Sequence, residues 1–137
     1  DYAQFFKKLM QFNVARSTKN VIFTGHTLDV LNEAKMEIET YVPVKGALKN
    51  QGIESYFSLV IGAKKMTLKS LEKYQNDLLT ITPQEEVRGF KYVFQTQLTK
   101  ETVNERLRGP MGMFSVDETY IDNKTQLVLD RLDEYYK

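Results

Sequence analysis

The chain has 137 residues, of which 42% are hydrophobic and 27% charged, and this composition is that of an ordinary globular domain able to bury a core. Zero cysteines exclude disulfides and thiolate metal sites, and a single histidine makes a zinc site unexpected. The net charge of +1 excludes a general electrostatic attraction to nucleic acid, so any such contact needs a local basic patch.

The N-terminal part of the chain predicts a helix followed by strands. Residues 2–14 are predicted as an amphipathic helix with Lys7 and Lys8 on its outer side. The short apolar run at residues 21–23 predicts a strand buried on both faces, as in a parallel sheet. Residues 27–34 suit one or two helical turns or a loop, and the alternation at 36–43 predicts an edge strand. The helix prediction rests on the apolar residues Tyr2, Phe5, Phe6, Leu9 and Met10.

The middle of the chain predicts mixed structure. Residues 47–54 read as a short helix and residues 56–63 as a β-rich run. Thr67 is expected to cap a helix, and a hairpin is predicted between residues 79–82 and 87–97. The face of the capped helix would carry Leu71, Tyr74 and Leu78.

The last segment, residues 126–136, predicts a terminal helix. Its apolar side would carry Val128, Leu129, Leu132 and Tyr135. We therefore interpret residues 1–137 as a single α/β domain or as part of one.

The strand predicted at the start of residues 90–114 is followed by cations. Aromatic residues alternate there with other residues, which places them on one face of a sheet. Lys100, Arg106 and Arg108 come next, and guanidinium groups bind phosphate through parallel donors while staying charged. The alternative is a solvated turn in which Glu101 and Glu105 neutralise these cations.

Two further groups of polar residues are candidate sites. Thr24 and His26 follow the predicted strand at 21–23, and ligands of open α/β sheets bind at the carboxyl ends of strands. A hydrogen-bonded structural histidine is the alternative. An acidic cluster, Asp117, Glu118 and Asp122, reads as a solvated loop rather than a magnesium site, so no metal site is predicted.

Three segments resemble, in order, the C-terminal half of bacteriophage RecA-like AAA ATPases, the group that includes Sak-type single-strand-annealing and recombination ATPases. They read VIFTGHT (21–27), VKGALKNQGIESYFSLVIGAKK (44–65) and KYVFQTQLTKETVNERLRGPMGMF (91–114). The resemblance implies an α/β fold, a partial RecA-like P-loop NTPase sheet with flanking helices. It also implies a role in DNA recombination, repair or replication, with ATP and Mg as cofactors of the parent protein, single-stranded DNA as a partner and a homo-oligomeric state.

The chain departs from this family in lacking the phosphate loop GxxxxGK[ST]. The acidic magnesium-binding residue expected before Val21 is also missing. We therefore expect a fragment without the phosphate-loop half, which binds no cofactor and hydrolyses no ATP by itself.

The resemblance implies roles for the candidate residues. Arg106 or Arg108, with Lys100 beside them, would be an arginine finger inserted into a neighbouring subunit's nucleotide site. Thr24 or His26 would sense the γ-phosphate and pass its state to residues 27–34, although Asp29 and Glu33 make that loop unusually acidic for DNA contact.

Two other functions remain open from the sequence. One is a small nucleic-acid or protein binding module, supported by the missing phosphate loop and by the cluster of Lys64, Lys65 and Lys69. The other is a structural or assembly protein, in which apolar helix faces mediate subunit contacts.

No run of about 18 apolar residues and no charged-then-apolar leader occur, so neither a membrane span nor a signal peptide is expected. The expected location is the cytoplasm, that of the host cell if the protein is phage-encoded.

Overall fold

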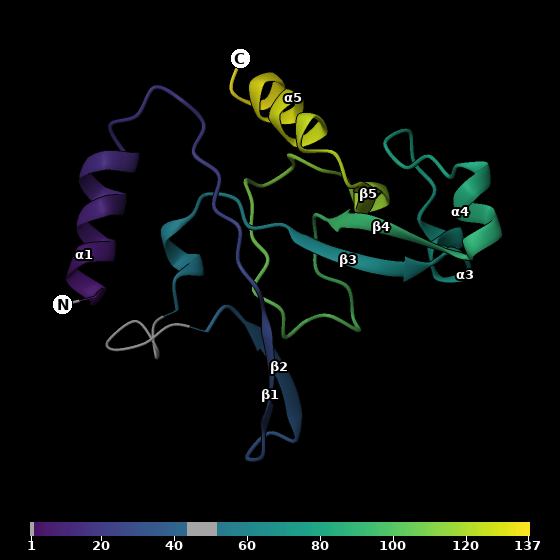
Figure 1. The fold of residues 1–137 in the computed structure, drawn as a ribbon, viewed down its shortest axis with the longest axis horizontal. Helices are drawn as coiled ribbons and strands as arrows, with labels where there is room; N and C mark the ends of the chain where they lie inside the picture. The colour runs from purple at the N-terminus through teal and green to yellow at the C-terminus, as the bar shows by residue number, and fades with distance from the viewer. Residues whose placement is uncertain (1, 44–51) are drawn as a thin grey trace. The chain divides into compact units, whose positions relative to one another are not determined.

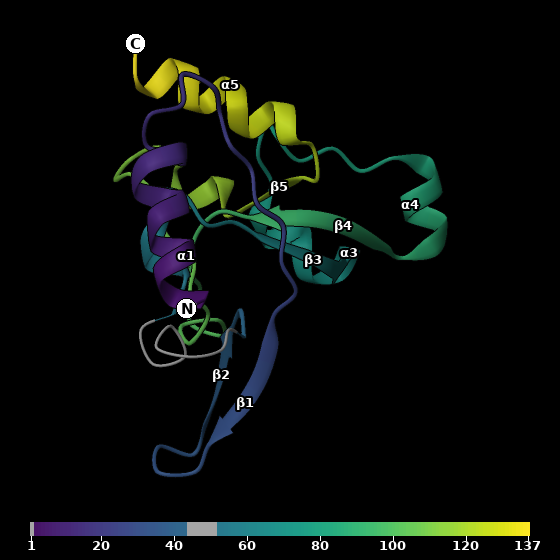
Figure 2. The same cartoon turned by 60° about the vertical axis from the view of Figure 1, so that its left-hand side comes forward.

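The computed structural model describes residues 2–43 and 52–137 and shows a mixed α/β protein. In this part of the chain two small antiparallel sheets and four α-helices occur (Figures 1 and 2). The chain forms two compact units. Unit 1 consists of Asp1–Phe57 and Asn104–Arg106, and unit 2 consists of Ser58–Val103 and Leu107–Lys137.

Unit 1 begins with the predicted amphipathic helix. Helix α1 (Tyr2–Lys8) continues as a π-helix at Leu9–Val14. Phe6 and Met10 are buried, and the Phe6 ring meets Tyr56 edge to face at a centroid distance of 5.4 Å. Tyr56 belongs to a short 3-10 helix, Glu54–Tyr56. The helix is confirmed, but its apolar face is only partly covered because Phe5 is 67% exposed.

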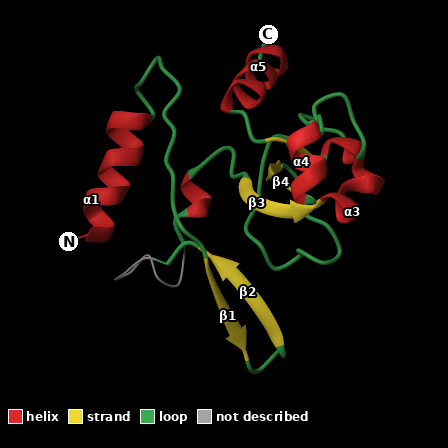
Figure 3. Ribbon diagram, turned by 45° about the vertical axis from the view of Figure 1, so that its right-hand side comes forward, coloured by secondary structure: helices red, strands yellow, loops and turns green. Residues whose placement is uncertain are grey.

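The sheet of unit 1 is a hairpin of β1 (Leu28–Asn32) and β2 (Glu37–Tyr41), which Figure 3 shows as a two-stranded ribbon. The edge strand predicted at 36–43 is confirmed. The helical or loop reading of 27–34 is wrong, because this segment pairs with β2 from Leu28 to Asn32. Met36, in the turn, adopts a left-handed conformation with φ 53°.

The buried strand predicted at residues 21–23 is also wrong. These residues form no strand, and their side chains are 44%, 61% and 44% exposed. A strand needs a neighbour to satisfy its backbone N–H and C=O groups, and β1 and β2 pair with each other instead. The short helix predicted at 47–54 lies mostly outside the described residues.

Unit 2 contains a three-stranded antiparallel sheet in the order β3 (Gly62–Thr67), β4 (Phe90–Gln95) and β5 (Tyr120–Asp122). The alternating strand predicted from Phe90 onward is confirmed as the central strand β4. The β-rich run expected at 56–63 is displaced toward the C-terminus, because its strand begins at Gly62.

Unit 2 also contains three helices, which are α3 (Leu68–Leu71), α4 (Pro83–Arg88) and α5 (Thr125–Tyr135). The cap at Thr67 is confirmed, since its side chain accepts a hydrogen bond from the Ser70 backbone N–H. The terminal helix is confirmed as α5. The hairpin predicted across residues 83–86 is wrong, because these residues lie in α4.

The signals that build α4 are local. Thr82 and Glu85 form a reciprocal capping box, and Pro83 stands in the first turn, where its missing N–H costs no hydrogen bond. Gly89 ends the helix in a left-handed conformation with φ 81°, which a residue without a Cβ adopts without strain. The chain therefore leaves α4 and enters β4 directly.

The sheet of unit 2 has a hydrophobic cluster on each side. Val93 packs with one cluster, and Phe94, the next residue of the strand, packs with the other, as the alternation of a strand requires. The first cluster contains the buried residues Leu71, Leu79, Val93 and Tyr120. The second contains Met113, Phe114, Ile121 and Val128. Helix α5 supplies Val128 to the second cluster, so it packs on the sheet face that carries Phe94 and Ile121, and it lies near β5 in Figure 1.

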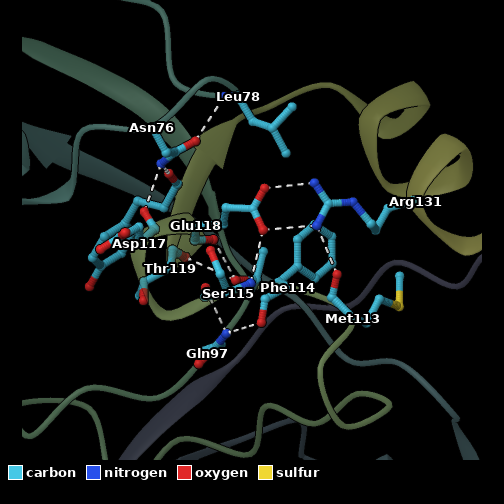
Figure 4. Close-up of polar contacts among 12 residues, drawn as sticks. Asn76, Leu78, Gln97, Met113, Phe114, Ser115, Asp117, Glu118, Thr119 and Arg131 are labelled. Atoms are coloured by element: carbon cyan, nitrogen blue, oxygen red, sulfur yellow. Dashed lines mark hydrogen bonds and ion pairs between the residues drawn. The ribbon is translucent and has the colours of Figure 1, made fainter. Parts of the chain in front are cut away.

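Arg131 on α5 is held by a carboxylate and a carbonyl (Figure 4). Its guanidinium donates to both carboxylate oxygens of Glu118, at 2.8 and 2.6 Å, and to the carbonyl of Met113 at 2.8 Å. Glu118 also accepts from the Ser115 backbone N–H at 2.8 Å. The reading of Asp117, Glu118 and Asp122 as a solvated loop is therefore wrong for Glu118, and it is wrong for Asp122, which is buried.

We expect the stability of unit 2 to depend on pH through Glu118. The hydrogen bond from Arg131 lowers the pKa of Glu118 to about 2, from 4.5. A carboxylate with a lowered folded-state pKa stabilises the fold above pH 4.5, and this contribution is lost as the pH falls toward 2. Glu118→Gln should remove most of it, so the free energy of unfolding of the variant should fall less steeply than wild type over this pH range. Urea titrations at successive pH values measure this. Glu86→Gln, at an exposed position, should leave the wild-type slope unchanged.

Candidate functional site

The three predicted phosphate-binding cations do not form one cluster on a single unit. Arg106 belongs to unit 1, whereas Lys100 and Arg108 belong to unit 2. All three side chains are exposed. The backbone of Arg108 pairs with Val60 in an isolated antiparallel bridge, which fixes its main chain beside the segment that leads into β3.

Arg106 is engaged within its own unit. Its guanidinium lies 3.4 Å from the carboxylate of Glu54 and 5.0 Å from the ring centroid of Tyr41. Glu54 is buried and also accepts from the Val42 backbone N–H at 2.9 Å. A role in a neighbour's nucleotide site would leave this buried carboxylate without its cation, which is costly. The finger role therefore stays a prediction for both arginines.

Thr24 and His26 lie at exposed positions of the irregular segment before β1. The strand that would have presented them to a ligand is absent from residues 21–23, so they do not stand at a strand end. Among the described residues, no group of three or more His, Cys, Asp or Glu side chains could hold a metal ion. No helix in the same ranges is both long and apolar enough to cross a membrane.

The structure instead brings aromatic and basic side chains together on one open part of the sheet of unit 2. Tyr92 is 54% exposed, and its ring meets that of Phe90 edge to face at a centroid distance of 5.8 Å. Lys65 is the cross-strand partner of Tyr92 and places its Nζ 5.4 Å from the Phe90 ring centroid. The Cζ of Arg88 lies 5.2 Å from the same centroid. We call Lys65, Arg88, Phe90 and Tyr92 the aromatic platform.

The end of α4 and the start of β4 position the platform. Arg88 is the last residue of α4, and only Gly89 separates it from Phe90. The Gly89 carbonyl also accepts from the Leu68 backbone N–H at 3.0 Å, which ties this turn to the start of α3. Figure 1 shows α3 and α4 together at the end of the sheet where β3 ends and β4 begins. The turn therefore holds the guanidinium beside the aromatic rings.

A buried ion cluster fixes α4 on the opposite face of β4. Lys91 Nζ donates to both carboxylate oxygens of Glu85 at 3.0 Å and lies 3.2 Å from Oδ1 of Asp122. All three residues are buried. Burial alone would raise the pKa of Glu85, but the hydrogen bonds from the Thr82 backbone and from Lys91 outweigh it, so this pKa is lowered. Glu85 therefore stays ionised and keeps α4 attached to β4.

We expect Lys91→Met to destabilise the chain by about 3–5 kcal/mol, because two buried carboxylates would lose their only shared cation. The matched control is Lys65→Met, the same substitution at an exposed position of the adjacent strand, which should change stability by less than about 0.5 kcal/mol. Urea unfolding at neutral pH, followed by circular dichroism, measures both. Equal effects of the two substitutions would contradict the structural role of Lys91.

The sequence contained part of this site. The alternation around Tyr92 predicts an aromatic face, and Lys65 belongs to the basic cluster of Lys64, Lys65 and Lys69. Arg88 was missed, because the hairpin prediction placed it inside a strand rather than at a helix end. The pattern Thr82-Pro83 with Glu85 and Gly89 is a signal that could have found it. The pairing of β3 with β4 depends on tertiary contacts and left no local signal.

No protein-family model, no curated protein and no solved structure matches this chain. The function therefore has to be argued from the site itself.

Proposed function

We propose that unit 2 binds single-stranded nucleic acid on the aromatic platform. The observation that carries the proposal is an exposed tyrosine next to a second aromatic ring, on the same sheet face as Phe94, with Lys65 and Arg88 over that second ring. Proteins that bind single strands combine aromatic rings, on which bases stack, with cations that contact the phosphates. Unit 2 offers both kinds of group within one small area.

Tyr92 is the stacking residue in this proposal. More than half of its side chain is exposed, whereas Phe90 is half-buried beneath the two cations. A base in a duplex has its faces covered by neighbouring base pairs, so an exposed ring on a sheet favours unpaired bases. The strand beneath Tyr92 is held by the buried cluster at Lys91, which keeps the ring in place without needing the ligand.

Lys65 and Arg88 supply the phosphate contacts. Both are exposed, and each approaches the Phe90 ring from a different element, β3 and α4. The net charge of the whole chain is only +1, so binding would depend on these local cations. The affinity of a site that makes few phosphate contacts falls only moderately as the salt concentration rises.

The interpretation as part of a RecA-like ATPase is a separate proposal that rests on the sequence resemblance alone. A partial RecA-like sheet, ATP and Mg in a parent protein, and a role in DNA recombination would all follow from it. Single-strand binding by the aromatic platform is compatible with that role but does not require it. In a parent protein that hydrolyses ATP, Arg108→Ala tests the finger role directly: nucleotide binding should persist while turnover is lost.

We expect Tyr92→Ala to weaken binding of a short single-stranded oligothymidine by about 1–3 kcal/mol, the usual loss when one stacked base loses its aromatic partner. Fluorescence anisotropy with a labelled oligonucleotide measures this affinity. The matched control is Tyr136→Ala, which removes a tyrosine that is 65% exposed on the same unit but far along the chain at the end of α5. Equal losses in both variants, or no binding by the wild-type chain, would contradict the proposal.

The phosphate contacts have their own test. Lys65→Ala and Arg88→Ala should each lower the salt dependence of binding, by about 0.7 in the slope of log affinity against log salt concentration. Lys124→Ala removes an exposed cation from the loop before α5 and should leave this slope unchanged. An oligoribonucleotide of the same length distinguishes a DNA preference from tolerance of either sugar, and a duplex should bind more weakly than both.

A further inference from the structure

Unit 1 carries two exposed apolar surfaces of opposite charge. The first lies on the N-terminal helix, where Phe5 is 67% and Phe12 48% exposed. Phe5, Lys8, Leu9 and Asn13 line one depression on this helix. Phe5 and Leu9 are one helical turn apart, so they share a face on the side not occupied by buried Phe6 and Met10. The helix therefore has a second apolar stripe that the described residues of unit 1 leave partly exposed.

Basic residues predominate in and after this helix. Between residues 2 and 28 the chain has no Asp or Glu, and its charged residues there are Lys7, Lys8, Arg16 and Lys19. All four are exposed, and the Arg16 guanidinium lies 5.3 Å from the ring centroid of Phe12. We call Phe5, Lys8, Leu9, Phe12 and Arg16 the basic helix face.

The second surface is the hairpin of β1 and β2. Five large apolar side chains on it are 38–78% exposed, namely Leu28, Val30, Leu31, Met36 and Ile38. The cross-strand pair Leu31 and Ile38 lies on one face, and Leu28 and Val30 lie on the other. Both faces are apolar and open. The base of the hairpin is tied to residues 104 and 105, because the Thr40 backbone N–H donates to the Asn104 carbonyl and Thr40 bridges Glu105. The apolar side chains along the rest of the hairpin are exposed, so a partner that covers them would stabilise it.

The charge of the hairpin is the reverse of that of the helix. Its acidic residues are Asp29, Glu33, Glu37 and Glu39, against a single Lys35. Glu33 and Glu37 are exposed at and beside the turn. We call residues 28–41 the acidic hairpin.

We propose that the acidic hairpin of one copy of this chain docks on the basic helix face of a second copy. Each surface offers exposed apolar side chains, and their charges are complementary, so the second copy satisfies both needs at once. Contact between two different surfaces is heterologous and leaves the helix face of one copy and the hairpin of the other copy free. Association therefore closes as a reciprocal dimer or a larger ring, or continues as an open filament.

Charge reversal on each surface tests the pairing. Lys8→Glu with Arg16→Glu reverses the helix face, and Glu33→Lys with Glu37→Lys reverses the turn end of the hairpin. In each double variant the helix face and the hairpin carry charge of the same sign. Two copies of that variant therefore repel each other at the proposed contact, and the association constant should fall at least about tenfold. Sedimentation velocity over a range of protein concentration at low salt measures the association, which should also weaken at high salt.

Mixing gives the decisive result. The helix-reversed variant keeps an acidic hairpin, and the hairpin-reversed variant keeps a basic helix, so an equimolar mixture should associate again. A variant carrying all four substitutions should associate by itself, which also shows that these positions tolerate the changes. The matched control, Glu72→Lys with Glu86→Lys, reverses two exposed charges of unit 2 and should associate like wild type.

Three outcomes would overturn the proposal. They are a wild-type chain that stays monomeric at low salt, a mixture that stays monomeric, and a combined variant that folds but does not associate. An anionic membrane surface is the other partner that a basic amphipathic helix suits. Binding of the wild-type chain to phosphatidylserine vesicles that is lost on helix reversal, without self-association in solution, would assign the helix to lipid instead.

Discussion

The ammonium group of Lys91 is the constraint on which unit 2 depends. It stands on the central strand, donates to both carboxylate oxygens of Glu85 and forms an ion pair with Asp122. Asp122 in turn accepts from the Thr80 backbone N–H at 3.0 Å. One buried cation therefore joins α4, β4, β5 and the segment before α4. A buried charge without partners costs free energy of folding, so these elements are constrained to fold together. The aromatic platform lies on the opposite face of the same strand, β4, and is therefore held in place by them.

The predictions that succeeded from sequence were those that a local pattern decides. The terminal helix, the cap at Thr67 and the alternation around Tyr92 each follow from spacing within one segment. Alternation shows that a strand has two faces but not which face is buried. The face with Lys91 and Gln95 reads as the polar one, yet both residues are buried, because Lys91 finds carboxylates from two other elements. That outcome depends on tertiary pairing, which spacing cannot reveal.

The errors in the first part of the chain have a related cause. Three apolar residues at 21–23 are too few to specify a strand unless a neighbour supplies hydrogen bonds, and in the described residues β1 and β2 use each other. The hairpin was hidden because residues 28–41 mix acidic and apolar side chains on both faces, which weakens the period-2 signal. The same mixture leaves apolar groups open on both sides. The mixture of acidic and apolar side chains that hides the hairpin in the sequence is therefore also what makes the hairpin suitable for binding a partner.

Self-association through unit 1 would strengthen the binding of a nucleic-acid strand by unit 2, because it brings several platforms together. A platform with one exposed stacking ring and two cations offers few contacts, so a single copy would bind a strand weakly. The chain leaves unit 2 after Val103, contributes Asn104–Arg106 to unit 1 and returns at Leu107, so covalent connections tie each platform to an associating unit. Once one platform of an assembly holds a strand, the next binds at a high effective concentration and the affinities multiply. Weak individual sites are then sufficient, provided that unit 1 assembles several copies along the same strand.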